Sequence, residues 1–257
     1  MRSLVLVALG SLVAAGNLAA QDFRWHAPLA SGKTLEVRGI SGRVRAVRAS
    51  GGEAEVTAVK KAGRRGDPKD VEIKVVEDGD GVTICAVYPT RRSGMSECRP
   101  GGGDGDNIRD VDVSVDFEVK VPAGVDFVGT TVNGDVYASE LPADARVSSV
   151  NGDVEVSAAG TARGTTVNGS VVATVGKAGW SGTLEFSTVN GGIKLTLPSD
   201  LDADVDASTV NGSIDSDFPI TVQGRMRPRE FHGRIGKGGR KLELSTVNGS
   251  IELRKGA

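Results

Sequence analysis

The sequence predicts an all-β protein whose C-terminal half is a parallel β-solenoid. Three observations predict this fold: a Val-Asn-Gly tripeptide occurs six times, apolar and polar residues alternate over long stretches, and aromatic residues make up only 4% of the chain while Gly is abundant. Alternation with a period of two is typical of strands that bury one face. A motif that returns at intervals of about 20 to 50 residues is typical of stacked repeats.

Residues 1–20 have the layout of a secretory signal peptide. Arg2 precedes an apolar stretch from Leu4 to Ala15, and small residues then lead to Ala20. This arrangement is typical of a cleaved export signal, and the apolar stretch is shorter than the roughly 20 residues of a membrane span. We therefore expect an exported mature chain, in the periplasm, outside the cell or at the cell surface, with no transmembrane span.

The chain has two cysteines, Cys85 and Cys98. Disulfides persist in oxidising compartments, so an exported chain is expected to join this pair. The chain-entropy model assigns a loop of this length roughly 3 kcal/mol of stabilisation. A reactive thiol pair is the alternative, but the short Cys-x-x-Cys spacing of such pairs is absent from the sequence.

The formal net charge is −2 for the whole chain. A near-balanced charge argues against a dedicated nucleic-acid-binding protein, because such proteins concentrate basic residues on one face. We therefore expect no nucleic-acid partner.

Residues 21–121 are expected to form an N-terminal β region of the solenoid that includes the disulfide loop. The clearest strand pattern is 110–121, in which valines and one phenylalanine take one face and polar residues take the other. Pro122 ends this segment because proline cannot donate a ladder hydrogen bond. Shorter alternating segments occur at 35–47, 53–59, 71–76 and 82–87.

Residues 122–257 contain the repeats and are expected to form the Val-Asn-Gly solenoid. Ser or Thr precedes Val in every copy. The last two copies are 37 residues apart, an interval that holds either two rungs or one rung with an insertion. The repeated residues are expected to have structural roles; they are Asn133, Gly134, Asn151, Gly152, Asn168, Gly169, Asn190, Gly191, Asn211, Gly212, Asn248 and Gly249.

Asn-Gly between strands also favours a tight hairpin, so two architectures compete. In a two-residue hairpin, the residue before Asn faces the same way as the residue after Gly. Here Val always precedes Asn, whereas the residue after Gly is Asp, Ser or Gly and the next residue is always Val or Ile. A tight hairpin would place these two apolar positions on opposite faces. The pattern therefore favours a chain that bends through each tripeptide and continues into a rung of a parallel stack.

In this interpretation, the Val of the tripeptide and the following Val or Ile both face the interior. Before several of the tripeptides, the spacing between apolar residues changes from two residues to three, which places the corner at the Ser-Thr pair. Asn tolerates left-handed backbone dihedrals and is able to bond to the same Asn of the next rung. Gly allows neighbouring rungs to approach closely. Because parallel crossovers are nearly always right-handed, we expect a right-handed solenoid.

The hexapeptides, together with the segment from Leu242 to Ile251, resemble the bacterial putative-adhesin, domain-of-unknown-function family of β-strand repeat proteins. The segment from Val119 to Pro122, before the first repeat, is similar to that family as well. The resemblance extends from about Leu35 to Leu253 and is strongest from Val111 onward. It implies a β-solenoid and an extracytoplasmic location, and it implies no catalytic residue.

The residue pattern predicts no catalytic site, no metal site and no cofactor. His26 and His232 are far apart, and neither has a metal-type spacing with Cys, Asp or Glu. The sequence has no Gly-x-Ser-x-Gly elbow. A row of alternating acidic residues is interpreted as a solvated outer strand face rather than a cation site; it consists of Asp200, Asp202, Asp204 and Asp206.

A basic segment interrupts the last interval between repeats. It is a candidate for contact with an anionic glycan or lipid headgroup, although a solvated loop is the simpler interpretation. Its basic residues are Arg225, Arg227, Arg229, Arg234, Lys237, Arg240 and Lys241.

These observations favour a non-enzymatic exported β-solenoid that acts as a cell-envelope scaffold or an adhesin-like interaction surface. Its partner would be an unknown protein or an anionic glycan of the envelope. One alternative is a polysaccharide-active β-helix enzyme, which would need carboxylates in a cleft and is disfavoured by the low aromatic content. The other is an accessory or sensor component of an envelope-stress system. Fold alone does not choose among these functions.

Overall fold

The computed structural model describes residues 23–92, 94–102, 108–109, 111–177, 179–180, 182–222 and 230–256. The signal peptide predicted at residues 1–20 lies outside this part of the chain. The only helical element among the described residues is the 3₁₀ helix η1 (Pro68–Asp70), and the remaining elements are strands. None of the helical structure described is long and apolar enough to cross a membrane.

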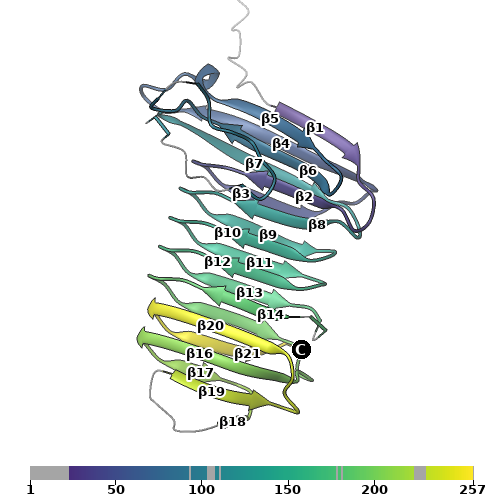
Figure 1. The fold of residues 1–257 in the computed structure, drawn as a ribbon, viewed down its shortest axis with the longest axis vertical. Coiled ribbons are helices and arrows are strands. Elements are labelled where there is room, and N and C mark those ends of the chain that lie inside the picture. Colours follow the sequence, from purple (N-terminus) through teal and green to yellow (C-terminus); the bar gives the residue numbers. More distant parts are fainter. Residues whose placement is uncertain are drawn as a thin grey trace, which may run out of the picture.

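The strands form two long sheets that face each other along the axis of the molecule (Figure 1). The first sheet has ten strands, in the spatial order β1 (Phe23–Pro28), β4 (Glu53–Ala62), β7 (Val113–Val121), β3 (Val44–Arg48), β9 (Val136–Leu141), β11 (Val154–Ala158), β13 (Val171–Val175), β15 (Ile193–Leu197), β21 (Ile251–Lys255) and β17 (Ile214–Ser216). The second sheet has eleven, in the order β18 (Ile220–Val222), β19 (Glu230–Ile235), β16 (Ala203–Asn211), β20 (Lys241–Asn248), β14 (Thr183–Ser187), β12 (Ala162–Thr165), β10 (Ala145–Ser148), β8 (Asp126–Thr130), β2 (Thr34–Arg38), β6 (Gly81–Val87) and β5 (Glu72–Glu77).

Each central rung consists of one strand from each sheet, joined through a Val-Asn-Gly corner. Four successive rungs are β8 with β9, β10 with β11, β12 with β13, and β14 with β15. Strands of neighbouring rungs are parallel and in register, so that Val154 lies between Val136 and Val171. The predicted parallel β-solenoid is therefore confirmed, and its right-handed sense stays a prediction.

Stacked aliphatic side chains fill the interior of the solenoid. The position two residues after each repeat Gly is the clearest case. Parallel pairing places each of these side chains against the same position of the next rung, and full burial of one Val or Ile contributes about 1.5–3 kcal/mol. The predicted inward position is confirmed for Val136, Val154, Val171, Ile193 and Ile251, each at most 1% exposed.

The rungs do not follow the order of the sequence at the C-terminal end. The last rung, β20 with β21, lies between β14 with β15 on one side and β16 with β17 on the other. Of the two alternatives for the long interval between Asn211 and Asn248, the described residues therefore fit one rung with an insertion rather than two successive rungs. Its described strands β18 and β19 run antiparallel at the edge of the second sheet and cover the end of the stack.

The N-terminal end has a similar arrangement. The rung of β2 and β3 lies between β6 with β7 and β8 with β9. Antiparallel strands β1, β4 and β5 form the outer edges of the two sheets here. Strands on both sides of the expected boundary at residues 121 and 122 belong to the same two sheets, so the division of the chain into two regions stays a prediction.

Candidate interaction surface

Each corner of the solenoid is fastened by a buried hydroxyl group. Thr188 is 4% exposed, and its Oγ1 donates a 2.7 Å hydrogen bond to the carbonyl of Gly169 in the neighbouring rung. Burial of that carbonyl without a donor would cost roughly 1–3 kcal/mol. The same bond is made by Thr131 to Gly42, Ser149 to Gly134, Thr166 to Gly152, Thr209 to Gly249, and Thr246 to Gly191.

The sequence interpretation of the corner was wrong in one respect, because it placed the repeat Val inside and the corner at the Ser-Thr pair. In the structure Thr188, not Val189, continues the inward alternation after Phe186, and Val189 is 40% exposed. The inward side chain at residue 188 faces the carbonyl of Gly169 in the neighbouring rung. That carbonyl needs a hydrogen-bond donor, and a Val side chain has none. The corner therefore lies at Val-Asn-Gly itself. Sequence reasoning missed the hydroxyl, although Ser or Thr before every Val was the signal.

The repeat asparagines form a continuous ladder of side-chain hydrogen bonds along the corner. Asn190 Nδ2 donates to Asn168 Oδ1 at 2.7 Å, and Asn168 Nδ2 donates to Asn151 Oδ1 at the same distance. The predicted asparagine stacking is confirmed, and none of the repeat asparagines adopts the left-handed dihedrals that Asn tolerates. Glu140 is the one non-Gly residue with positive φ in the described part of the chain.

The repeat glycines allow the rungs to touch through their backbones. A Cβ atom at Gly191 would lie 2.0 Å from the carbonyl oxygen of Gly169, which no side chain tolerates. Gly169 itself has φ +155 and would clash in the same way with Gly152. The predicted close approach at Gly is therefore confirmed at these corners.

The side chains that the corner turns outward form an uncharged stripe. Its centre is the valine row, which we define as Val150, Val167, Val189, Val247 and Val210 in spatial order, each 39–54% exposed. Neighbouring members lie on hydrogen-bonded strands, about 4.8 Å apart. Ser and Thr residues such as Thr165, Ser187 and Ser245 flank the row and line with it a shallow groove of about 520 Å³.

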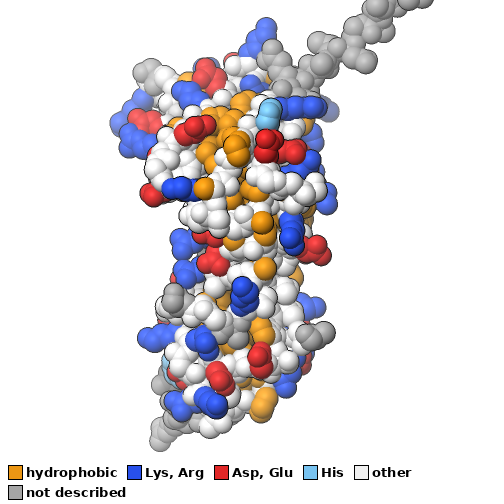
Figure 2. All heavy atoms as spheres, turned by 90° about the vertical axis from the view of Figure 1, so that its right-hand side faces the viewer, with side chains coloured by type: hydrophobic (Ala, Val, Ile, Leu, Met, Phe, Trp, Pro, Cys, Tyr) orange, Lys and Arg blue, Asp and Glu red, His pale blue; other side chains and the backbone are white. Residues whose placement is uncertain are grey.

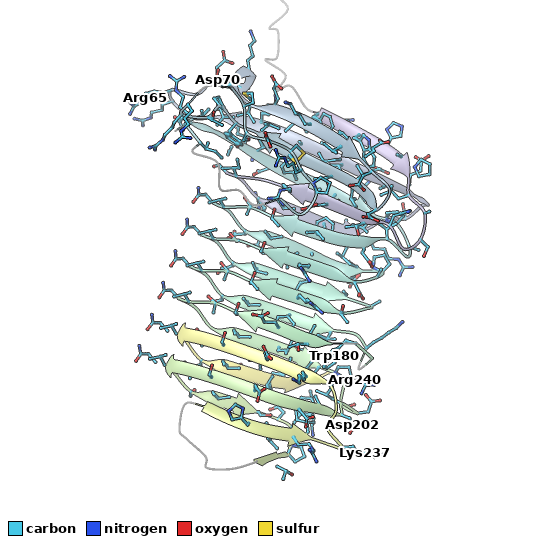
Figure 3. All side chains as sticks on the ribbon, in the orientation of Figure 1. Arg65, Asp70, Trp180, Asp202, Lys237 and Arg240 are labelled. Carbon is cyan, nitrogen blue, oxygen red and sulfur yellow. A yellow bond between two sulfur atoms is a disulfide. The ribbon has the colours of Figure 1, made fainter. Side chains whose placement is uncertain are left out.

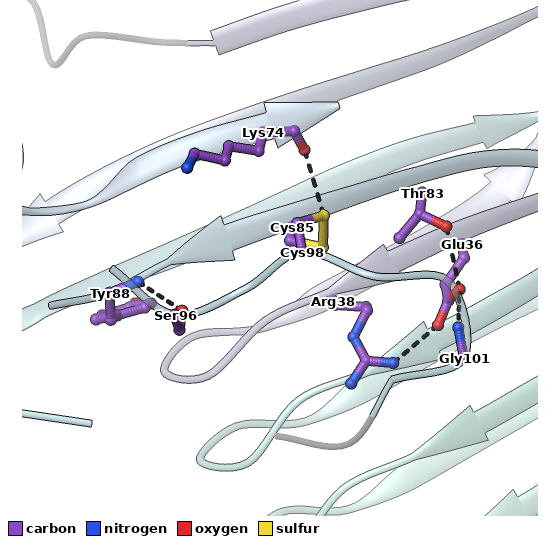
Figure 4. The surroundings of a disulfide bond; sticks show 9 residues. All are labelled: Glu36, Arg38, Lys74, Thr83, Cys85, Tyr88, Ser96, Cys98 and Gly101. Carbon is purple, nitrogen blue, oxygen red and sulfur yellow. Dashed lines mark hydrogen bonds and ion pairs between the residues drawn. A yellow bond between two sulfur atoms is a disulfide. The ribbon is translucent and has the colours of Figure 1, made fainter. Parts of the chain in front are cut away.

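The predicted disulfide joins Cys85 of β6 to Cys98, with Cα atoms 5.7 Å apart. It holds a segment that we name the strap, residues 88–92 and 94–102, against the outer face of the second sheet (Figure 4). Beneath the strap, Glu36 accepts hydrogen bonds from Arg38 Nη1 at 3.0 Å and from the backbone N–H of Gly101 at 3.0 Å. Because the strap covers them, Glu36 and Arg38 are only 6% and 8% exposed on a face that carries solvated residues elsewhere.

Tyr88 anchors the start of the strap. Its hydroxyl donates to the carbonyl of Val113 at 3.1 Å, and its ring is 2% exposed. Burial raises the pKa of Tyr88 to about 12, against a smaller lowering by its contact with Ser41. The phenol therefore stays protonated at neutral pH and keeps its role as a donor.

The acidic row and the basic segment lie against each other. Strand β19 pairs antiparallel with β16, which sets Arg234 opposite Asp204 and His232 opposite Asp206. Arg234 Nε lies 3.2 Å from Asp204 Oδ1, and His232 Nδ1 contacts Asp206 Oδ1. Backbone donation from Gly239 and, next, side-chain donation from Arg234 lower the pKa of Asp204. The acidic row is thus partly paired, which differs from the fully solvated strand face that the sequence predicts.

Most of the described basic segment supports the end of the solenoid through its backbone. The Lys237 N–H donates to Asp202 Oδ1 at 2.7 Å, and the carbonyls of Arg240 and Lys241 accept from Asp204 N–H and Trp180 Nε1 (Figure 3). Arg225, Arg227 and Arg229 lie outside the described residues. Contact of this segment with an anionic partner stays a prediction.

Histidine, cysteine and acidic side chains do not gather into a metal site in the part of the chain that the structure describes. No group of three or more His, Cys, Asp or Glu side chains there is arranged to hold a metal ion. On the face shown in Figure 2, basic and acidic side chains are interspersed along the solenoid. The most regular surface is therefore the uncharged stripe at the Val-Asn-Gly corner.

A family model described as Toastrack DUF4097 matches residues 112–254, which is more than half of the 257 residues. Among solved structures, the chain is similar to a putative cell adhesion protein of Clostridium sporogenes ATCC 15579, with 11% identity, a TM-score of 0.47 and coverage of 92% of this chain and 100% of that one. It is also similar to a putative adhesin of Bacteroides fragilis NCTC 9343, with 9% identity, a TM-score of 0.32 and coverage of 91% and 97%. No curated protein matches the chain.

Proposed function

The chain belongs to the Toastrack DUF4097 family, and from this premise we propose that it is an exported, non-enzymatic β-solenoid whose outer surface binds a partner in the cell envelope. It would act as a scaffold or in the manner of an adhesin. Export is supported by the signal-peptide layout of residues 1–20 and by the disulfide between Cys85 and Cys98, which an oxidising compartment preserves.

The observation that carries the proposal is the valine row. Every repeated residue of the corner except Val has a partner inside the fold: the hydroxyl bonds a carbonyl, Asn bonds Asn, and Gly contacts Gly. The Val side chains have no such role, since they remain 39–54% exposed. An apolar row on a rigid and uncharged surface is typical of a site for a protein or glycan partner.

Two adjacent members of the row provide the test. Val167→Ser and Val189→Ser together remove the apolar groups of neighbouring rungs without touching the hydroxyls or the asparagines. Val172→Ser is the control, because Val172 is also 40% exposed but lies on the outer face of β13 and outside the valine row and its groove. We expect the double variant to sediment with the envelope fraction of the producing cell about tenfold less than the wild type does. The control should bind normally, and all three chains should melt at similar temperatures.

Equal binding of the double variant and the wild type would contradict the role of the valine row. Export is tested separately with a fusion of the full chain to alkaline phosphatase, which gains activity only outside the cytoplasm. The non-enzymatic assignment would be overturned by release of products when the purified protein is incubated with acidic and neutral polysaccharides.

A further inference from the structure

A polar cleft of about 1010 Å³ lies at the N-terminal end of the solenoid, far along the stack from the C-terminal cap. It is formed by the end of β4, the segment before η1, the strap and the start of β7. Figure 3 labels Arg65 and Asp70 at this end of the molecule. The charged residues of its lining are Lys61, Arg65, Asp70, Arg109 and Asp112.

Two of these five charged groups are occupied within the fold. Lys61 Nζ donates to Asp116 Oδ2 at 2.6 Å, which neutralises that ammonium group. Asp112 Oδ2 accepts the backbone N–H of Arg65 at 3.1 Å. Lys61 therefore adds no net charge to the cleft, whereas Asp112 keeps its negative charge because a backbone N–H is a neutral donor.

The loop that carries Arg65 packs closely against Asp112 at the edge of the cleft. It has the sequence Gly63-Arg64-Arg65-Gly66 and folds tightly over Asp112. A Cβ atom would lie 2.0 Å from Asp112 Oδ1 at Gly63, and 1.9 Å from the Asp112 carbonyl oxygen at Gly66. The two glycines therefore permit a close approach that presents the intervening arginines on a short, anchored turn.

The second arginine is anchored from the strap. The backbone N–H of Arg109 donates to the carbonyl of Pro89 at 2.8 Å, beside the bridge between Thr90 and Ile108. Within the described chain, the guanidinium groups of Arg65 and Arg109 and the carboxylate of Asp70 have neither a hydrogen bond nor an ion pair. Two cationic forks from separate segments thus line one cleft, together with the carboxylates of Asp70 and Asp112.

We infer that this cleft binds an acidic saccharide. Guanidinium groups recognise carboxylates through paired charge-assisted hydrogen bonds, which suits Arg65 and Arg109. A free carboxylate in the same cleft disfavours a purely anionic ligand but accepts hydrogen bonds from sugar hydroxyls, which suits Asp70. The hydroxyls of Ser41 and Ser114 add neutral polar groups to the lining. A uronic-acid polymer offers both a carboxylate and hydroxyls on each unit.

This inference goes beyond the proposed role of the valine row and does not depend on it, because the two surfaces share no residue. The test uses the full mature chain in affinity electrophoresis through gels that contain polygalacturonate, polyphosphate or neutral dextran. Arg65→Gln with Arg109→Gln removes both cleft guanidinium groups. Arg146→Gln with Arg163→Gln removes the same net charge from the outer face of the second sheet and is the matched control.

We expect polygalacturonate to retard the wild type and the control variant, and the apparent affinity of the cleft variant to fall about tenfold or more. Thermal unfolding of both variants should match the wild type, since the substituted side chains are exposed or half-buried. Three results would overturn the inference: no retardation of the wild type, an equal loss in both variants, or retardation by polyphosphate alone. The variant with Val167→Ser and Val189→Ser should still bind polygalacturonate, so that failure of one proposal is distinguishable from failure of the other.

Discussion

Asn248 donates a 2.7 Å hydrogen bond to Asn190, 58 residues earlier in the chain, while Asn211, which lies between them in the sequence, donates to Asn248 at 2.8 Å. The last rung in the sequence, β20 with β21, therefore lies between two rungs that precede it in the sequence. Until β20 and β21 are in place, β14, β15 and β16 each lack one strand partner, and β17 lacks the only strand it pairs with among the described residues.

The inserted rung should be required for the fold of the whole C-terminal end. Deletion of residues 241–257 removes the parallel partners of β14, β15, β16 and β17 in one step. Because solenoid rungs are unstable without neighbours, we expect the truncated chain to lose cooperative thermal unfolding by circular dichroism. Deletion of residues 256–257 alone removes one backbone hydrogen bond, from Gly256 to Leu197, and should leave the transition nearly unchanged. If the chain without residues 241–257 still unfolds cooperatively at the wild-type temperature, the role of the inserted rung is contradicted.

The buried corner hydroxyl gives a second prediction. Thr188→Val keeps the shape of the side chain but leaves the Gly169 carbonyl without its donor. We expect the free energy of unfolding to fall by about 1–3 kcal/mol in urea titration. Thr188→Ser keeps the hydroxyl and should lose less. Val189→Thr, one residue along on the exposed side of the corner, should be close to neutral, and an equal loss at both positions would show that the hydroxyl has no special role.

The corner also shows what could be predicted from the sequence. Alternation with period two predicted the parallel rungs, because the position of Val154 or Ile193 depends only on apolar residues seeking the interior. The same rule failed for Val189, since a buried carbonyl outweighs the burial of a methyl group at that position. The pattern of apolar residues does not reveal that a carbonyl group of the neighbouring rung needs a hydrogen-bond donor at this position.

The order of rungs was not accessible from the pattern either. Each repeat fits any neighbour equally well, because the repeat asparagines, glycines and inward aliphatic residues are alike in all copies. Strand β19 occupies one edge of β16, with cross-strand pairs such as Asp204 with Arg234, and this leaves the other edge of β16 for β20. Such pairs were visible in the sequence only as two separate charge runs. The cleft at Arg65 and Arg109 was missed for a similar reason, since the strap brings together residues from two loops.

The strap should depend on its disulfide for stability. Cys85 and Cys98 are 13 residues apart, and closure of a loop of that size contributes roughly 3 kcal/mol in the chain-entropy model. We expect dithiothreitol to lower the Tm of the wild type, and the variant with Cys85→Ser and Cys98→Ser to melt at the lower temperature with or without the reductant. If the reductant lowers the Tm of the double variant equally, the effect does not come from this disulfide.

Two aspartates with opposite pKa shifts should respond to pH in opposite ways. Burial raises the pKa of Asp126 above 3.8, against a partial lowering by the backbone N–H of Asp144, and the negative charge of Asp144 adds to the rise. The folded state therefore disfavours the ionised carboxylate at neutral pH, and this penalty disappears as the pH falls below the unfolded value of 3.8. Asp126→Asn keeps an oxygen for the Asp144 N–H and removes the charge, so we expect its Tm to exceed that of the wild type by about 1 °C at neutral pH. The difference should vanish near pH 3.

Asp217 gives the matched comparison of opposite sign. The side chain of Arg254 and the backbone N–H of Lys255 donate to its carboxylate, which lowers the pKa of Asp217 below 3.8. A lowered folded pKa contributes stability that is present above pH 3.8 and is lost as the pH falls through the folded value. We therefore expect Asp217→Asn to lower the Tm at neutral pH and to approach the wild type in acid. Differential scanning calorimetry from pH 2.5 to pH 7, values chosen to span roughly the titration range of carboxylates, would measure both variants. A change of the same sign for Asp126→Asn and Asp217→Asn at neutral pH would contradict these assignments.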